Sequence, residues 1–250
     1  MEKTARNSAP QLHVFATVEE VLYGLADLFV ALAERATAAR GRFSVALSGG
    51  GSPKKLYELL ASPAYRERVR WEQVYFFFGD ERNVPATDPQ SNFLMATQAL
   101  LAPLGIAPTQ VFAVHTSLPP AKAAEEYTQT ITDFFGEAEL RFDLVLLGLG
   151  DNSHTASLFP HTAVLHDATV GAREVFVPEL DAHRITLTAP LLNLAHAVAF
   201  LVYGADKAAA VRHVLRDARD VEEFPAQLIA PSDGELHWFL DEAAAVHLTL

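Results

Sequence analysis

Apolar residues are arranged along this chain in two patterns: short, mostly uninterrupted runs, and longer stretches with helical spacing. The short runs cover residues 43–47, 74–78, 143–147, 184–188, 197–203 and 236–240. Gly79 and Gly148 follow two of them directly. A run of this length that a turn residue closes is typical of a buried β-strand. The runs therefore predict the strands of a buried sheet.

Helical spacing fills the segments between these runs. Thr17 and Glu20 have the spacing of a capping box, and apolar residues at helical intervals follow them as far as Arg40 and Gly41. Serine residues indicate two further helix starts, with Ser52 before Pro53 and Ser91 before a helix to about residue 101. We also expect helices over residues 121–135 and 205–216.

Strand and helix thus alternate along the chain. Nearly continuous apolar strands that alternate with helices indicate an α/β fold with a largely parallel sheet and helices on both faces. The sequence contains no repeat, low-complexity segment or linker. We expect one domain over residues 1–250, with a small insertion near residues 103–120.

Composition narrows the range of functions. The 250 residues carry a formal net charge of −12, which argues against nucleic acid as a partner because phosphate backbones require a basic face. The absence of cysteine excludes a thiolate nucleophile and a disulfide scaffold. No apolar stretch is long enough for a membrane span, and residues 1–10 do not have the pattern of a signal peptide. We therefore expect a cytoplasmic protein.

The loop after the first apolar run contains three consecutive glycines. In open α/β sheets, ligands bind beyond the carboxyl ends of the strands. Ser48, Gly49, Gly50, Gly51 and Ser52 lie between a predicted strand and a predicted helix. Glycines allow close backbone approach, and a helix N-terminus attracts anions, so we expect an anion cradle here. The loop lacks the lysine of a Walker motif, and the alternative is a plain tight turn.

Charged residues follow the second run. Asp80, Glu81 and Arg82 come directly after Gly79. A guanidinium group suits bidentate recognition of phosphate or carboxylate, and Asp80 could position Arg82 or a substrate hydroxyl. A solvated turn explains the same residues equally well. Asn92 is a further candidate, although a simple helix cap at Ser91 also explains its segment.

A histidine follows the third run. His154 comes after Gly148-Leu-Gly150, which lacks the third glycine of a dinucleotide motif. The unperturbed pKa of histidine, about 6.5, makes His154 a candidate general base. The spacing of His154, His161 and His166 matches no metal pattern, so we expect no metal. For an isolated histidine, a hydrogen-bonding role alone would be the favoured interpretation.

Two more cations lie near predicted strand ends. Arg184 opens one apolar run, and Lys207 falls in the first turn of the helix after another. A cation at a helix N-terminus is slightly unfavourable, which is easier to understand if Lys207 faces an anion. A solvated surface lysine is the alternative.

Together and in this order, these loops resemble the 6-phosphogluconolactonase family, part of the glucosamine-6-phosphate isomerase/6-phosphogluconolactonase superfamily. Seven matching segments, from residue 47 to 241, carry the resemblance: Leu47-Ser-Gly-Gly-Gly-Ser-Pro53, Phe78-Gly-Asp-Glu-Arg82, Ser91-Asn-Phe93, Leu147-Gly-Leu-Gly150, His154-Thr-Ala-Ser-Leu-Phe-Pro160, Arg184-Ile-Thr-Leu-Thr188 and Trp238-Phe-Leu-Asp241.

The resemblance implies a modified Rossmann-like fold and hydrolysis of 6-phosphoglucono-δ-lactone to 6-phosphogluconate, without metal or cofactor, in the oxidative pentose phosphate pathway. It implies that His154 is the acid/base and that residues 48–52 and 80–82 contribute to the substrate site. The candidate substrate residues also include Asn92, Asn152, Arg184 and Lys207. The family usually has Asp-Gly before the histidine, where this chain has Asn152 and Ser153.

Two alternatives stay open at this stage. One is an isomerase/deaminase acting on an amino-sugar phosphate, which shares the glycine loop and the histidine. The other is a non-catalytic sugar-phosphate binding protein, which the change at Asn152 and Ser153 favours. We expect a small-molecule partner and a monomer or small homo-oligomer.

Overall fold

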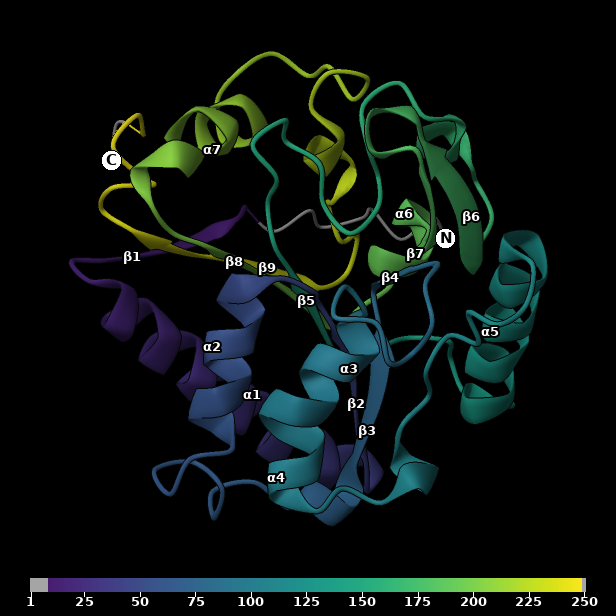
Figure 1. The fold of residues 1–250 in the computed structure, drawn as a ribbon. Helices are drawn as coiled ribbons and strands as arrows, with labels where there is room; N and C mark the ends of the chain where they lie inside the picture. Colours follow the sequence, from purple (N-terminus) through teal and green to yellow (C-terminus); the bar gives the residue numbers. More distant parts are fainter. Residues whose placement is uncertain (1–8, 249–250) are drawn as a thin grey trace, which may run out of the picture.

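A six-stranded parallel sheet forms the centre of the computed structural model, which describes residues 9–248 (Figure 1). Every neighbouring pair of strands is parallel, in the order β1-β9-β8-β5-β2-β3. The strands are β1 (Gln11–Phe15), β2 (Phe43–Leu47), β3 (Val74–Phe78), β5 (Leu144–Leu147), β8 (Ala197–Val202) and β9 (Glu235–Asp241).

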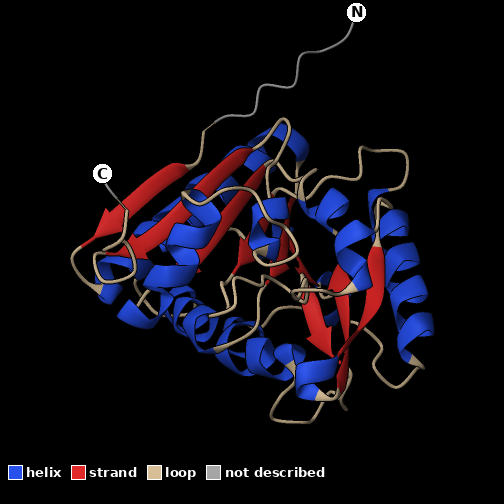
Figure 2. Cartoon of the chain, turned by 90° about the horizontal axis from the view of Figure 1, so that it is seen from above, coloured by secondary structure: helices blue, strands red, loops and turns tan. Residues whose placement is uncertain are grey.

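Helices cover both faces of this sheet, as the sequence predicted (Figure 2). Alternate residues along the strands enter two apolar clusters, one on each face of the sheet. In β5, Leu144 and Leu146 pack on one face, and Val145 and Leu147 on the other. The first cluster includes side chains of α1 (Val18–Arg40), α2 (Gly51–Leu60) and α3 (Asn92–Ala96). The second includes side chains of α5 (Pro120–Phe135), α6 (Ala189–Leu192) and α7 (Ala208–Leu215).

The first predicted helix begins and ends as expected. Thr17 caps α1, and its side chain and that of Glu20 form the reciprocal bonds of a capping box. Gly41 ends the helix with a φ of 73°, a left-handed conformation that glycine adopts without strain. Ser91 also caps α3, but the expected helix to residue 101 continues through a π-helical turn (Thr97–Leu101) into α4 (Ala102–Leu104).

The predicted cap at Ser52 is wrong. Helix α2 begins at Gly51, and its N-cap is Gly50, with a φ of 102° and no side-chain cap. Ser52 and Pro53 both lie within the first turn. The glycine sequence allows the chain to turn into the helix earlier than a serine cap would.

A second sheet of three antiparallel strands lies beside the first. Its order is β4 (Asp80–Arg82), β7 (Ala182–Leu187) and β6 (Ala172–Val177). The run at 184–188 is thus a strand, as predicted, but it is not part of the parallel sheet. Strands β1, β4 and β6 were not predicted. Strands β1 and β6 mix polar and apolar residues over a short length, and β4 consists of three charged residues.

The segment near 103–120 runs along the outer edge of the parallel sheet. It contains a 3₁₀ turn (Pro108–Gln110), and the N–H of Phe112 donates to the carbonyl of Phe76 in β3 at 2.9 Å. The organisation of the chain as one domain with an insertion here stays a prediction. Over residues 9–248, no helix has the length and apolar character to cross a bilayer.

The direction of winding reverses between β2 and β5. After β2 the chain moves outward to β3 on one side, and after β5 it moves to β8 and β9 on the other. Ligands bind at such a reversal, beyond the carboxyl ends of the strands. The loops that follow β2 and β5 contain the glycine sequence and His154, so the topology brings these two predicted sites together.

Candidate active site

The glycine loop forms one wall of a cleft of about 230 Å³. A buried tyrosine of α2 fixes the start of this loop. The N–H of Ser48 donates to Tyr57 Oη at 2.9 Å, and this hydroxyl donates to the carbonyl of Ser48 at 2.8 Å. Burial raises the pKa of Tyr57, so the phenol stays protonated and makes both bonds. In the described part of the chain, the N–H groups of Gly49 and Gly50 donate to no protein atom, which leaves them free for an anion.

Position 49 has no room for a side chain, because Asn92 lies directly beside it. A Cβ atom at this position would lie 1.9 Å from Asn92 Oδ1. Asn92 is buried, donates from Nδ2 to the carbonyl of Asp80 at 2.9 Å, and does not line the cleft. The structure therefore places this predicted substrate residue behind the glycine loop, where it lies against Gly49 and bonds to β4.

The three charged residues of β4 have different surroundings. Glu81 is buried and accepts backbone N–H groups of Arg82, Asn92 and Phe93, each at 2.8 Å. Burial raises the pKa of Glu81, against the effect of these bonds. Asp80 instead lines the cleft and accepts from Ser157 Oγ at 2.6 Å. Glu81 thus holds the backbone of β4 and the start of α3 together, and Asp80 faces the cleft.

Two arginines are paired across the antiparallel sheet. Arg82 of β4 lies opposite Arg184 of β7, and side chains of such a pair share one face. Arg82 Nη1 donates to the carbonyl of Gln90 at 2.5 Å, but the Nε atoms of both arginines are buried without a hydrogen-bond partner. Burial and then the charge of Arg82 lower the pKa of Arg184. Two adjacent guanidinium groups with unused donors favour an anionic ligand.

His154 lies between two clefts. It lines the cleft of the glycine loop and a second one, of about 460 Å³, which Arg82, Arg184, Asn152 and Leu180 also line. Its imidazole stacks on Phe159, with ring centroids 4.0 Å apart. It also packs over Gly150, where a Cβ atom would lie 2.1 Å from Nδ1. Nδ1 is 2.5 Å from Asn152 Oδ1.

Burial lowers the pKa of His154 to about 4. Lys207 and Arg184 also lower this pKa, and Asp80 and Asp151 raise it. The imidazole is therefore neutral at neutral pH, which a general base requires.

Lys207 lies just before α7 and reaches the same cleft. Its ammonium group forms an ion pair with Asp151. Lys207 thus faces a carboxylate of the histidine loop, which covers residues 148–171 between β5 and β6, and its contact with a substrate anion stays a prediction. Since Asp151 is largely exposed, a bound ligand can compete for this lysine.

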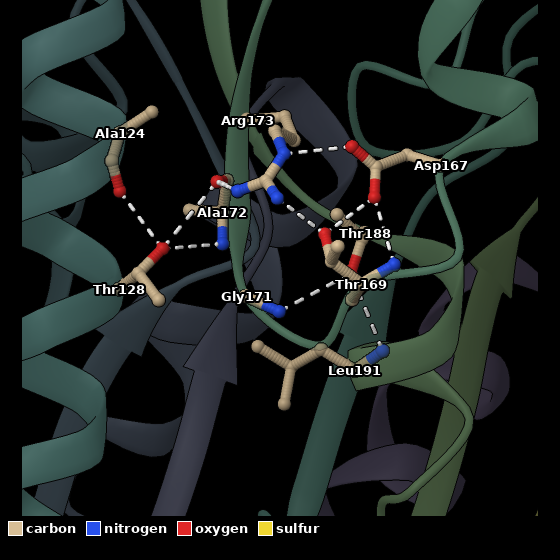
Figure 3. Close-up of polar contacts among 9 residues, drawn as sticks. All are labelled: Ala124, Thr128, Asp167, Thr169, Gly171, Ala172, Arg173, Thr188 and Leu191. Carbon is tan, nitrogen blue, oxygen red and sulfur yellow. Dashed lines mark hydrogen bonds and ion pairs between the residues drawn. The ribbon is translucent and has the colours of Figure 1, made fainter.

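Several contacts hold the histidine loop in place. The N–H of Ala226 donates to the carbonyl of Ser153 at 2.9 Å, and Ser153 has a φ of 61°. Ser157 joins the loop to Asp80. Farther along, Asp167 accepts from Arg173 Nε at 2.7 Å and from the N–H of Thr169 at 2.8 Å (Figure 3).

The same network attaches the end of the loop to two helices (Figure 3). Thr188, the N-cap of α6, donates from Oγ1 to the carbonyl of Thr169 at 2.7 Å. Thr128 of α5 accepts from the N–H of Ala172 in β6 at 2.8 Å. The end of the loop is thus fixed to regular structure.

The structure brings together eleven of the twelve predicted site residues. They line one or both clefts: Ser48, Gly49, Gly50, Gly51, Ser52, Asp80, Arg82, Asn152, His154, Arg184 and Lys207. The sequence did not predict the roles of Tyr57, which fixes the glycine loop, and of Ser157, which bonds to Asp80. Ser157 lies in the segment after His154 and could have been considered, but no sequence signal marks a tyrosine that fixes a distant loop.

The other two histidines of this region face carboxylates. His166 Nε2 is 2.7 Å from Glu222, and His161 Nε2 is 3.1 Å from Glu223. Over residues 9–248, no three His, Asp or Glu side chains are arranged to hold a metal ion.

Comparison with known proteins shows the family of this chain. Residues 16–238 match the family model described as glucosamine-6-phosphate isomerases/6-phosphogluconolactonase. The chain is 41% identical to a 6-phosphogluconolactonase of Nostoc sp. over 90% of this chain and 92% of that protein. It is 37% identical to the human 6-phosphogluconolactonase, over 96% and 94% of the two chains.

Solved structures give the same result. The 6-phosphogluconolactonase of Trypanosoma brucei superimposes with a TM-score of 0.83 at 30% identity, over 96% of this chain and 99% of that one. The cradle, the histidine and the paired arginines thus occur in a chain that matches these proteins over nearly its whole length. This protein belongs to the glucosamine-6-phosphate isomerase/6-phosphogluconolactonase family.

Proposed function

We propose that this chain hydrolyses 6-phosphoglucono-δ-lactone to 6-phosphogluconate, in the oxidative pentose phosphate pathway, with His154 as general base. The observation that carries the proposal is a neutral, partly buried imidazole between an anion cradle and a pair of guanidinium groups. The relatives named above carry the name 6-phosphogluconolactonase, which supports the same substrate.

Several hydrogen-bond donors of the protein line the cleft and are available to the phosphate group of the lactone. The free N–H groups of the glycine loop lie on one wall, and Arg82 and Lys207 also line it. Binding of the phosphate would replace Asp151 as the partner of Lys207. Asp80 then offers an acceptor to a sugar hydroxyl. We assign Asn92 a supporting role, since it lies directly against Gly49 and bonds to the carbonyl of Asp80.

The reaction needs a base and then an acid at one position. As a water oxygen attacks C1, one proton of that water passes to Nε2 of His154, and the carbonyl becomes a tetrahedral oxyanion. The oxyanion then collapses, the C1–O5 bond breaks, and the proton on Nε2 passes to O5. The products are a carboxylic acid, which ionises at neutral pH, and a free hydroxyl at C5. An activated ester of this kind can be attacked by water with the help of a base alone.

Replacement of His154 tests the proposal. His154→Ala should lower kcat by about 10²–10⁴-fold, the usual contribution of a general base. The measurement is a coupled assay that detects 6-phosphogluconate, corrected for spontaneous hydrolysis, with wild type measured in parallel. Turnover of His154→Ala close to wild type would remove the base assignment. Release of ammonia from glucosamine 6-phosphate by wild type would instead favour the deaminase alternative, and ligand binding without turnover would favour a binding protein.

We propose that the protein acts in the cytoplasm as a monomer or small homo-oligomer. Fractionation of cells and sedimentation of the purified protein test these two statements.

A further inference from the structure

Two nitrogen atoms of His154 converge on one atom of Asn152. Asn152 Oδ1 lies 2.5 Å from Nδ1 of the imidazole and 3.4 Å from the backbone nitrogen of His154. A backbone N–H can only donate, so the amide atom that it meets is the acceptor oxygen. Nδ1 must then carry a proton too, because an unprotonated ring nitrogen would oppose its lone pair to that of the oxygen.

Other contacts fix the plane of the ring but not its proton. Phe159 stacks on the imidazole, and Gly150 leaves room for it. Neither residue offers a hydrogen-bond acceptor to Nδ1 through its side chain. Within residues 9–248, Nε2 of His154 makes no hydrogen bond to another residue. Asn152 is therefore the contact that decides which ring nitrogen is protonated.

We propose that Asn152 is a positioning residue that holds His154 in the Nδ1–H tautomer and leaves Nε2 unprotonated as the base. This inference rests on the proposed role of His154. It replaces our expectation that Asn152 binds substrate. An amide oxygen achieves this orientation without adding a charge, whereas a carboxylate at the same position would also favour the imidazolium form.

The charges around His154 explain why a neutral partner matters. Asp80 faces it from β4, Arg184 from β7, Lys207 from the turn before α7, and Asp151 from its own loop. The two carboxylates and the two cations act in opposite directions, so burial dominates and keeps the pKa of His154 low. A third carboxylate, at position 152, would shift this balance toward the charged ring.

Three variants test the proposal, together with ¹⁵N-histidine NMR of the resting protein. Asn152→Asp keeps an acceptor and adds a charge, and Asn152→Ala removes the acceptor. Asn193→Ala is the matched control. It loses bonds to the carbonyl of Leu228 and the N–H of Ala230, and Asn193 lines neither of the two clefts. For each protein, the tautomer and pKa of His154 are measured with kcat, KM and Tm.

We expect wild type and Asn152→Asp to show the Nδ1–H tautomer. In Asn152→Asp the pKa of His154 should rise by about 1–3 pH units. In Asn152→Ala the ring should change to the Nε2–H tautomer, and kcat should fall by about 10²–10⁴-fold with KM within about twofold of wild type. Asn193→Ala should lower Tm and leave the tautomer and kcat unchanged.

Other results would overturn the proposal. An Nε2–H tautomer in wild type would do so, as would an unchanged pKa of His154 in Asn152→Asp. A rise in KM without loss of kcat in Asn152→Ala would return this residue to substrate binding. If Asn152→Ala does not fold, the NMR comparison of wild type with Asn152→Asp still decides. Because the tautomer is observed without substrate, a failure here is distinct from an active His154→Ala variant, which would refute the base itself.

Discussion

Ser153 has a backbone conformation that a glycine would adopt more easily. Its φ is 61°, and its side-chain hydroxyl is buried without a hydrogen-bond partner. The chain tolerates this because the carbonyl of Ser153 accepts the N–H of Ala226. Ser153 thus adopts the backbone conformation that leads to His154, but its positive φ and its buried hydroxyl lower the stability of the fold.

Ser153→Gly should therefore stabilise the protein. Relief of the left-handed conformation and removal of the buried hydroxyl outweigh the extra chain entropy of glycine, so the free energy of unfolding should rise by about 1 kcal/mol. Urea denaturation measures the difference. Gly50→Ser is the matched reverse change, since Gly50 has a φ of 102° and open space around its Cβ position, and it should be destabilising. A less stable Ser153→Gly protein would contradict this account.

For single residues, the sequence predicted which side chains lie together at the cleft, but not always the role of each one. His154, Arg82 and Lys207 line the cleft as expected, because each follows a predicted strand. Asn92 lies behind it, since its amide is used by Asp80. No pattern in the sequence distinguishes an amide that faces a ligand from one that holds a loop.

At the scale of elements, two tyrosines hold the ends of two strands in the same way. Tyr57 of α2 bonds to both the N–H and the carbonyl of Ser48, and Tyr127 of α5 bonds to those of Phe78. Each phenol satisfies a donor and an acceptor where the sheet ladder stops. Helices on opposite faces thus fix adjacent strand ends, from which the loops of the cleft depart.

Loss of the Tyr57 hydroxyl should weaken both stability and binding. In Tyr57→Phe the buried N–H and carbonyl of Ser48 lose their partner, which costs about 1–3 kcal/mol in the free energy of unfolding. The glycine loop becomes less ordered, so KM should rise. Chemical denaturation and steady-state kinetics measure the two effects. The control is Tyr75→Phe, the same change in β3, which should alter both by little. Equal effects of the two variants would count against this role of the Tyr57 hydroxyl.

The elements themselves were predictable to different degrees. The buried parallel strands were predicted from their apolar runs alone. Strand β4 was not predicted, because Asp80, Glu81 and Arg82 give no strand signal. Its existence depends on pairing with β7, about one hundred residues later, and this pairing aligns Arg82 with Arg184. Such long-range pairing is not visible in local sequence.

Across the whole molecule, several histidines are kept neutral by burial. Burial lowers the pKa of His13 in β1, of His154 in the cleft and of His196 before β8. A folded-state pKa below the unfolded value means that the unfolded chain binds more protons once the pH falls below about 6.5. Stability is therefore fully present above that pH and decreases as the pH falls toward the folded-state pKa values.

Thermal unfolding should show this dependence. We expect Tm to fall between pH 7.5 and pH 5.5, before most carboxylates are protonated. His196→Gln should reduce the slope of Tm against pH, because its neutral side chain gains no proton in the unfolded state. A Tm that is constant or rises over this interval would contradict the prediction.

The close approach of Gly49 to Asn92 and of Gly150 to His154 affects how this protein tolerates mutation. A scan of all substitutions, scored by cell growth that depends on the enzyme, should find both glycines as intolerant as His154 itself. Neither glycine gives a side-chain atom to the reaction. A methyl group at either position would meet a neighbour at about 2 Å. Positions that do not tolerate mutation in such a scan would therefore include those where a side chain would collide with the imidazole of His154 or the amide of Asn92, as well as the positions of reacting groups.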